Sequence, residues 1–253
     1  MKRVRRVRKW VVLSFILVCL ISCIYYSYEV ITWAIHVKAN NKIIDKIEKI
    51  YIVDPEKEEF KVDFKSLKEI NPDTIAYIKV NNTNISYVVV KGTDNSYYLT
   101  HNFEKKWNKA GWIFGDYHNK FDGEDKNLII YGHNMKDGSM FDSLKDTITK
   151  EWYENKNNHK VTLITEDNIF SYQVFSSYSI AVEDYYINTI FTSNEEFNKF
   201  INTLKSRTVY DYGVEVTPED KILTLSSCLG EGKKRVVLHA KLIDKKENIW
   251  KKN

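Results

Sequence analysis

Cys228 is the residue whose type and position in this chain most clearly suit chemistry. It ends the apolar run 222–227, and a glycine-containing loop follows it. The two other cysteines, Cys19 and Cys23, lie in an apolar N-terminal segment, so the rest of the chain can form no internal disulfide. A lone thiol at the end of a strand suits a nucleophile displayed at the rim of a sheet. The alternative interpretation is a buried free cysteine that only packs.

A nucleophilic thiol needs a base or a cationic partner that favours the thiolate. His133 fits this role because it follows the apolar run 128–131 and Gly132, where a strand opens into a loop. His239 is the second candidate, but it lies in the middle of a predicted strand. The remaining histidines have polar surroundings, and we interpret them as surface residues: His36, His101, His118 and His159.

Arg235 begins the last predicted strand, seven residues after Cys228. A hairpin between 221–228 and 235–242 would set its guanidinium beside the sulfur, where five N–H donors could hold a developing oxyanion. A surface arginine beside Lys233 and Lys234 is the alternative, and the short connecting loop also leaves Lys234 as a candidate partner. The sequence places no Asp or Glu as an obvious third member of a triad.

Eight short segments rich in β-branched and aromatic residues predict the strands that position these side chains. They are 74–80, 85–90, 112–115, 128–131, 160–165, 170–180, 221–228 and 235–242. Eight strands with few long helical patterns predict a mainly β fold, a closed barrel or a sandwich.

Helical patterns predict a few helices before and between these strands. They cover 41–51, 63–70, the surroundings of 140–146, 149–155 and 194–206. Ser193 is a predicted N-cap for the last of these, with Glu196 three residues later as in a capping box. This helix lies in an insertion of about 40 residues between two strands, a length typical of functional segments.

The N-terminus predicts a membrane anchor. Six basic residues precede an uncharged stretch, 10–28, which is long enough to span a bilayer as a helix. They are Lys2, Arg3, Arg5, Arg6, Arg8 and Lys9. Positive charge before the stretch predicts a cytoplasmic N-terminus and an external domain. A cleaved signal peptide or a lipoprotein box at 20–23 is the alternative, but the sequence stays apolar after Cys23.

Charge argues against a nucleic-acid partner. The chain has 38 basic and 34 acidic residues, so without the six N-terminal charges 32 basic residues remain against 34 acidic ones. A nearly neutral domain lacks the basic face that nucleic-acid binding requires. We expect a tail over 1–9, an anchor over 10–35, a helix and linker over 36–62, one catalytic domain over 63–245 and a C-terminal tail over 246–253.

Several motifs together resemble class B sortases. Thr-Leu-Ser-Ser-Cys over 224–228 resembles the Thr-Leu-x-Thr-Cys motif of sortases, and Arg-Val-Val-Leu-His over 235–239 is similar to their arginine strand. The segment 129–141 resembles the class B histidine segment, and 82–87, 94–99 and 113–117 also match. The resemblance covers about 64–242. Ser227 stands where the family has Thr, and His118 stands where class B members commonly have Arg.

The resemblance implies a closed eight-stranded barrel with N-terminal helices and a helix-bearing insertion, about 183–216, between strands six and seven. It implies a membrane-anchored cysteine transpeptidase of a Gram-positive cell, with its catalytic domain facing the cell wall. Cys228 would attack the sorting signal of an exported protein, His133 would act as acid and base, and a peptidoglycan amine would accept the acyl group. Arg235 would steady the oxyanion. Ser227, Thr224 and Asn84 would contact substrate or oxyanion.

This chemistry needs no metal or cofactor. Three alternatives remain at this point. A cysteine peptidase that only hydrolyses would use the same residues, and a non-catalytic surface binding module would use Cys228 for packing. An L,D-transpeptidase also pairs Cys with His, but no His-Gly-Cys cluster surrounds Cys228.

Overall fold

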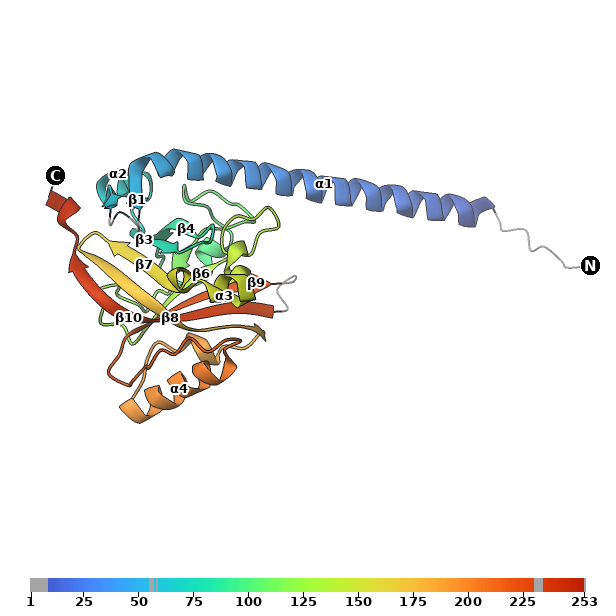
Figure 1. Ribbon diagram of the computed structural model, residues 1–253. Coiled ribbons are helices and arrows are strands. Elements are labelled where there is room, and N and C mark those ends of the chain that lie inside the picture. The colour runs from blue at the N-terminus through green and yellow to red at the C-terminus, as the bar shows by residue number, and fades with distance from the viewer. Residues whose placement is uncertain (1–8, 55–56, 58, 230–233, 253) are drawn as a thin grey trace, which may run out of the picture.

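A computed structural model describes residues 9–54, 57, 59–229 and 234–252 (Figure 1). For residues 53, 54, 60, 228, 229, 251 and 252 the backbone alone is described. Most of the expected basic tail, with Lys2, Arg3, Arg5, Arg6 and Arg8, lies outside the described residues, as does most of the loop between Cys228 and Arg235.

Eight strands close into a barrel in the order β10-β8-β7-β3-β4-β5-β6-β9. Their bounds are β3 (Thr74–Val80), β4 (Ser86–Val90), β5 (Phe114–Gly115), β6 (Asn127–Gly132), β7 (Lys160–Thr165), β8 (Asn168–Ala181), β9 (Ile222–Leu229) and β10 (Lys234–Glu247). The β4–β5 and β6–β9 pairs are parallel, and the other neighbours are antiparallel. The closed, mainly β fold is thereby confirmed.

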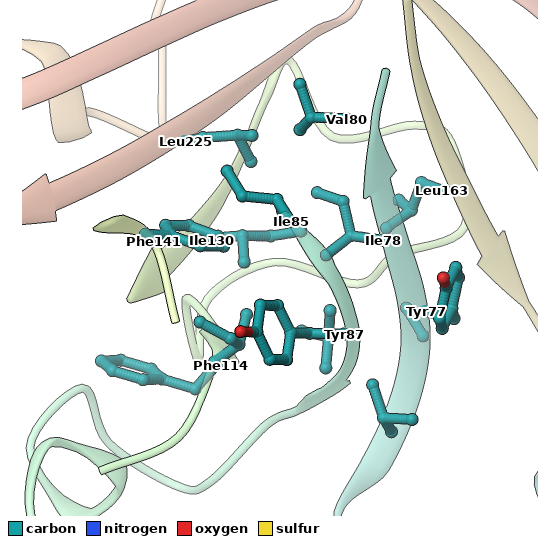
Figure 2. Packing of buried hydrophobic residues seen from close by; sticks show 14 of the residues in the cluster. Tyr77, Ile78, Val80, Ile85, Tyr87, Phe114, Ile130, Phe141, Leu163 and Leu225 are labelled. Atoms are coloured by element: carbon teal, nitrogen blue, oxygen red, sulfur yellow. The ribbon is translucent and has the colours of Figure 1, made fainter. Parts of the chain in front are cut away.

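The barrel interior holds the main core. Alternate strand residues point inward, and Figure 2 shows side chains from several strands meeting there, Ile78, Ile130 and Leu225 among them. These three are completely buried. Because each buried aliphatic side chain contributes about 1.5–3 kcal/mol, this interior fixes the positions of the strand ends.

α1 (Lys9–Ile47) is one continuous helix that projects well past the barrel (Figure 1). Its last turns dock on the domain, where Asn40, Ile43 and Ile47 are buried. The helix expected over 41–51 is therefore the end of α1. It ends at Ile47, where η1 (Glu48–Ile50) and then strand β1 begin.

β1 (Tyr51–Asp54) pairs with β2 (Glu59–Val62) in a separate hairpin that the sequence patterns did not predict. α2 (Phe64–Ile70) follows, and the Asp63 side chain caps it by accepting from the Ser66 N–H at 3.0 Å. The helix ends before Asn71-Pro72, as expected from the restriction that a proline places on its predecessor.

Two expected elements differ in the structure. The strand predicted over 112–115 is only the two-residue β5, because the Trp112 N–H donates to the Tyr98 carbonyl at 2.9 Å beside η2 (Tyr97–Leu99). The helix predicted around 140–146 is the 3₁₀ segment η3 (Asp142–Ile148). It is followed by α3 (Lys150–Glu154) and η4 (Lys156–Asn158), while η6 (Ile249–Lys252) closes the chain.

The insertion between β8 and β9 forms a second layer outside the barrel. It carries η5 (Tyr185–Ile187) and α4 (Asn194–Arg207), and Ser193 caps α4 by accepting from the Glu196 N–H at 3.1 Å. Phe197, Ile201 and Leu204 of α4 pack in one cluster with residues of β8 and β10. The insertion thus covers the outer face of the strands that lead to the predicted site.

Candidate active site

Strand register brings the backbones of the three predicted catalytic positions together. Cys228 of β9 and Arg235 of β10 are direct antiparallel partners. On the other side of β9, Ser227 is the parallel partner of Gly132, the residue before His133. The closed barrel therefore brings the end of β6 to the β9–β10 hairpin at one rim. The Cys228 side chain lies outside the described part of the chain.

His133 is fixed at the point where β6 opens into a loop. Its Nε2 lies 2.8 Å from the Leu99 carbonyl oxygen, and its own carbonyl accepts from the Phe141 N–H at 2.8 Å. Gly132 before it leaves no room for a side chain. A Cβ there would lie 2.5 Å from Ile113 Cδ1 and 2.6 Å from Phe141 Cγ. The glycine therefore lets β6 pack closely just before the histidine.

The contact with Leu99 assigns different tasks to the two ring nitrogens of His133. A carbonyl oxygen only accepts, so Nε2 must carry a hydrogen and donate it. Nδ1 is then the nitrogen that can gain or lose a proton without breaking this hydrogen bond. This arrangement suits a general acid and base whose ring keeps one orientation in both protonation states.

Arg235 is half-buried at the start of β10, and its Nη1 donates to the Lys234 carbonyl at 3.2 Å. It lines a groove of about 420 Å³ together with His133. The other residues of the groove come from the barrel rim and the insertion: Asn95, Leu99, Phe114, Tyr131, Gly132, Val182, Glu183, Asp184, Tyr186, Ile187 and Ser226. A permanent cation and an oriented imidazole thus face one partly apolar groove.

A sortase domain model matches residues 78–243. The chain belongs to the sortase family. Sortase B of Staphylococcus aureus is 32% identical over 246 residues, which covers 94% of this chain and 98% of that protein. Sortase B of Listeria monocytogenes is 32% identical over 217 residues, which covers 82% of this chain and 87% of that protein.

Solved structures give the same family. The substrate complex of Staphylococcus aureus sortase B superposes with a TM-score of 0.71 and 32% identity, covering 82% of this chain and 95% of that one. The sortase B structure from Clostridium perfringens gives 0.67 and 36%, covering 72% of this chain and all of that one. The class B resemblance is confirmed, and this sortase is a cysteine transpeptidase.

Asp116 supports the groove of this sortase, and sequence reasoning did not single out its role. Its buried carboxylate accepts from Asn95 Nδ2 at 2.8 Å and from the Tyr131 hydroxyl at 2.9 Å, and both partners line the groove. His118 contacts the same carboxylate through Nδ1 at 2.8 Å. The only sequence signal for Asp116 was the family motif over 113–117.

His239, the second histidine candidate, lies in a buried polar cluster under the insertion. Its Nδ1 lies 2.9 Å from Thr224 Oγ1 and its Nε2 lies 3.0 Å from the Tyr178 hydroxyl. Thr224 donates its proton to Asn127 Oδ1 at 2.6 Å, so its oxygen must accept from His239 Nδ1–H. Burial lowers the pKa of His239 to about 3, which keeps the ring neutral.

The same cluster holds the insertion on the barrel. Asn127 Nδ2 donates to the carbonyls of Tyr186 at 3.1 Å and Asn188 at 2.9 Å. The Tyr186 and Ser226 hydroxyls are 3.0 Å apart, and both residues line the groove. His239 is therefore placed as a structural residue behind one groove wall, and it is completely buried.

The three residues expected to contact substrate are not brought together. Ser227 is buried, and its hydroxyl donates to the Phe141 carbonyl at 3.2 Å. Thr224 is buried in the cluster around His239. Asn84 is exposed on the turn between β3 and β4, where its N–H donates to Ser143 Oγ at 3.0 Å. None of the three lies among the described residues that line the groove.

Proposed function

We propose that this sortase is anchored in the membrane, cleaves the sorting signal of exported proteins and transfers them to an amine of a peptidoglycan precursor. The pairing of Cys228 with Arg235 at the rim of a groove that also contains His133 carries this proposal. The solved complex of Staphylococcus aureus sortase B with its substrate supports a sorting signal as the ligand class. Cys228, His133 and Arg235 are the proposed catalytic residues.

The first step forms a thioester. The Cys228 thiolate attacks the scissile carbonyl carbon, and the carbonyl oxygen becomes an oxyanion that the Arg235 guanidinium stabilises. His133 then gives its Nδ1 proton to the leaving nitrogen as the C–N bond breaks. The N-terminal part of the substrate stays on sulfur, and the free amine departs. The hydrogen bond from Nε2–H of His133 to the Leu99 carbonyl holds the ring in place throughout.

The second step reverses these roles. The acceptor amine attacks the thioester carbonyl, and the neutral Nδ1 of His133 takes its proton. The C–S bond then breaks and returns Cys228 as a thiolate. Because the two steps use one histidine as acid and then as base, turnover needs both protonation states of His133 to be accessible. A new amide bond joins the substrate to the acceptor.

The anchoring part of the proposal rests on α1. The helix is long and apolar enough to cross a membrane. From Trp10 to Tyr28 its large side chains are exposed in the structure. We propose that it is a single-pass anchor with the N-terminus in the cytoplasm, which places the barrel on the cell-wall side.

A peptide panel tests the function. Full-length protein in lipid nanodiscs is mixed with quenched fluorogenic peptides of the Asn-Pro-x-Thr and Pro-x-Thr-Gly types, with and without an amine nucleophile. We expect one type to be cleaved and to yield an amine adduct, and Cys228→Ala to remove both signals. Cleavage by Cys228→Ala would overturn the assignment of the nucleophile.

Hydrolysis alone is the second candidate, since the same residues could pass the acyl group to water. The adduct separates the two functions. Cleavage that depends on Cys228 but never yields an amine adduct, across oligoglycine, diaminopimelate and lysine acceptors, would identify a peptidase. An adduct that forms at the expense of the hydrolysis product would identify the transpeptidase.

A further inference from the structure

The apolar surface of α1 continues past the uncharged stretch that ends at Tyr28. Beyond Glu29, the side chains of Val30, Ile31 and Ile35 are 62%, 59% and 59% exposed. A helix over residues 10–35 is about 39 Å long, whereas the hydrocarbon core of a bilayer is about 30 Å thick. The last turns of this apolar surface therefore reach the lipid headgroup layer on the domain side.

One barrel loop lies against these turns of α1. This loop, residues 100–111, is here called the helix-facing loop. Its Lys109 Nζ lies 2.6 Å from Glu29 Oε2, and its Asn108 donates to the His36 carbonyl at 3.0 Å. Its Trp107 ring packs edge-on against His36, with the ring centroids 4.9 Å apart. Figure 1 shows α1 running along the barrel before it projects beyond it.

The side chains on the outside of the helix-facing loop suit a lipid surface. Trp107 is 56% exposed, and the Lys106 side chain is 74% exposed while its Nζ pairs with Glu104 of the same loop at 2.8 Å. A tryptophan with a free face is the residue type enriched at the level of membrane headgroups, and lysine donates to lipid phosphates. The Lys109 contact also neutralises Glu29, which lowers the cost of a carboxylate at this depth.

We propose that the helix-facing loop docks on the outer phospholipid headgroups, with Trp107 inserted at the level of the glycerol groups and Lys106 near the phosphates. The proposal rests on the proposed anchoring by α1. The bilayer is the occupant because the loop lies beside the turns of the anchor that leave the hydrocarbon core. No other described residues combine an exposed tryptophan with contacts to these turns.

Docking of this loop would fix the orientation of the active site. The two limbs of the loop are joined by the Asn108 N–H to Thr100 carbonyl bond at 2.8 Å. Leu99, the residue before the loop, accepts the hydrogen bond of the His133 ring. In Figure 1, α1 leaves the barrel on the side where β9 ends and β10 begins. The rim at which Cys228 and Arg235 pair then lies on the membrane side of the barrel.

Tryptophan quenching in full-length protein tests this docking. The protein is reconstituted in vesicles of phosphatidylcholine and phosphatidylglycerol whose acyl chains carry bromine either near the glycerol or near the methyl end. We expect Trp107→Phe to lose a measurable share of the quenching by the shallow bromine and none of the quenching by the deep bromine. Trp250→Phe is the matched control, because Trp250 is also exposed, at 38%, but its ring lies beside Lys61 of β2 and not on the helix-facing loop.

Insertion of the anchor is measured separately through the quenching of Trp10, which is 79% exposed on α1. Loss of quenching in Trp10→Phe shows that the helix is inserted. If Trp10 is quenched and Trp107 contributes no quenching at either depth, the docking is overturned and the anchor stands. If neither is quenched, both fail. Cleavage of a soluble peptide should stay at the wild-type rate in Trp107→Phe, because this residue does not line the groove.

Discussion

The two histidines that the sequence offered as partners for Cys228 lie in opposite surroundings. His133 is half-buried at the rim, has one ring nitrogen bonded to a carbonyl and lines the groove. His239 is completely buried, and both of its ring nitrogens have partners inside the protein. A proton carrier needs a nitrogen that can reach substrate, whereas a structural histidine needs both nitrogens satisfied.

The contrast extends to the regions around them. The rim depends on the ends of strands and on the backbone of an irregular segment, so small displacements there change the geometry of the reacting groups. The buried cluster is a closed chain of hydrogen bonds from Tyr185 through His239 to Asn127. We therefore expect substitutions at the rim to reduce turnover, and substitutions in the cluster to reduce stability first.

Cys228→Ala should have the largest effect, a complete loss of cleavage and of amine adduct. Cys228→Ser should leave at most a trace, because a hydroxyl is far less ionised than a thiol at neutral pH. Thermal unfolding of both variants, followed by circular dichroism, should match the wild type. Turnover retained in the alanine variant would place the nucleophile elsewhere.

The histidines should respond in opposite ways to the same replacement. His133→Asn should lower kcat/KM by about 10²–10⁴-fold, the usual contribution of a general acid or base, with little change in the unfolding temperature. His239→Asn should lower the free energy of unfolding by about 1–3 kcal/mol, because the Tyr178 hydroxyl and Thr224 lose a buried partner. Peptide cleavage and thermal melts of the two variants, measured side by side, check both. Equal loss of activity in both variants would contradict a catalytic role for His133 alone and a structural role for His239.

Arg235→Lys should lose most of the activity although it keeps the positive charge. An ammonium group cannot reproduce the fork of donors that a guanidinium offers to an oxyanion or a substrate backbone. The loss should fall mainly on kcat, measured with a single peptide substrate over a range of concentrations. Near wild-type kcat would assign oxyanion stabilisation to another donor, and Lys234→Ala would then be the variant to compare.

The buried histidine also predicts how stability depends on pH. The unfolded chain binds a proton on His239 near pH 6.5, while burial keeps the folded pKa at about 3. The unfolded state therefore binds more protons between these values, so the free energy of unfolding falls as the pH drops from 6.5 toward 3. The facing Tyr178 stays neutral because burial raises its pKa. Denaturant unfolding from pH 7 to 4 should show a shallower decline in His239→Asn than in the wild type.

Tyr178→Phe should have the smallest effect, a loss of about 1 kcal/mol for each of two neutral hydrogen bonds, because the ring stays in place. The hydroxyl that it removes lies 3.0 Å from His239 and 2.8 Å from the Tyr185 hydroxyl. Tyr117→Phe is the matched control, because Tyr117 is 44% exposed. A larger change in kcat than in stability would mean that the cluster acts on the groove and not only on the fold.

Much of the barrel could be predicted from local patterns. The segments of β3, β7 and β9 followed from runs of β-branched residues with clear boundaries, and the caps of α2 and α4 follow the expected chemistry. The β1–β2 hairpin could not be predicted, because its strands are four residues each. The order of the strands is set by long-range closure, including the parallel β6–β9 pair, and leaves no local signal.

The sequence could predict which residues form the candidate site, but not the hydrogen bonds that hold them there. The pairing of Arg235 with Cys228 followed from a simple hairpin. The bond from His133 to the Leu99 carbonyl could not be foreseen, since any residue can present a backbone carbonyl. Asp116 was hidden for a related reason, because its partners Asn95 and Tyr131 lie on separate segments that only the closed barrel brings together.

Mass spectrometry of the acyl-enzyme tests the central claim most directly. The full-length protein is mixed with a substrate peptide that it cleaves, before and after addition of an amine. Each sample is quenched with acid and digested, and the fragment of the enzyme that contains Cys228 is analysed. We predict a thioester of the N-terminal substrate fragment on Cys228 that disappears as the amine adduct forms, and that accumulates less in His133→Asn. Turnover without any adduct on Cys228 would contradict a cysteine transpeptidase mechanism at this rim.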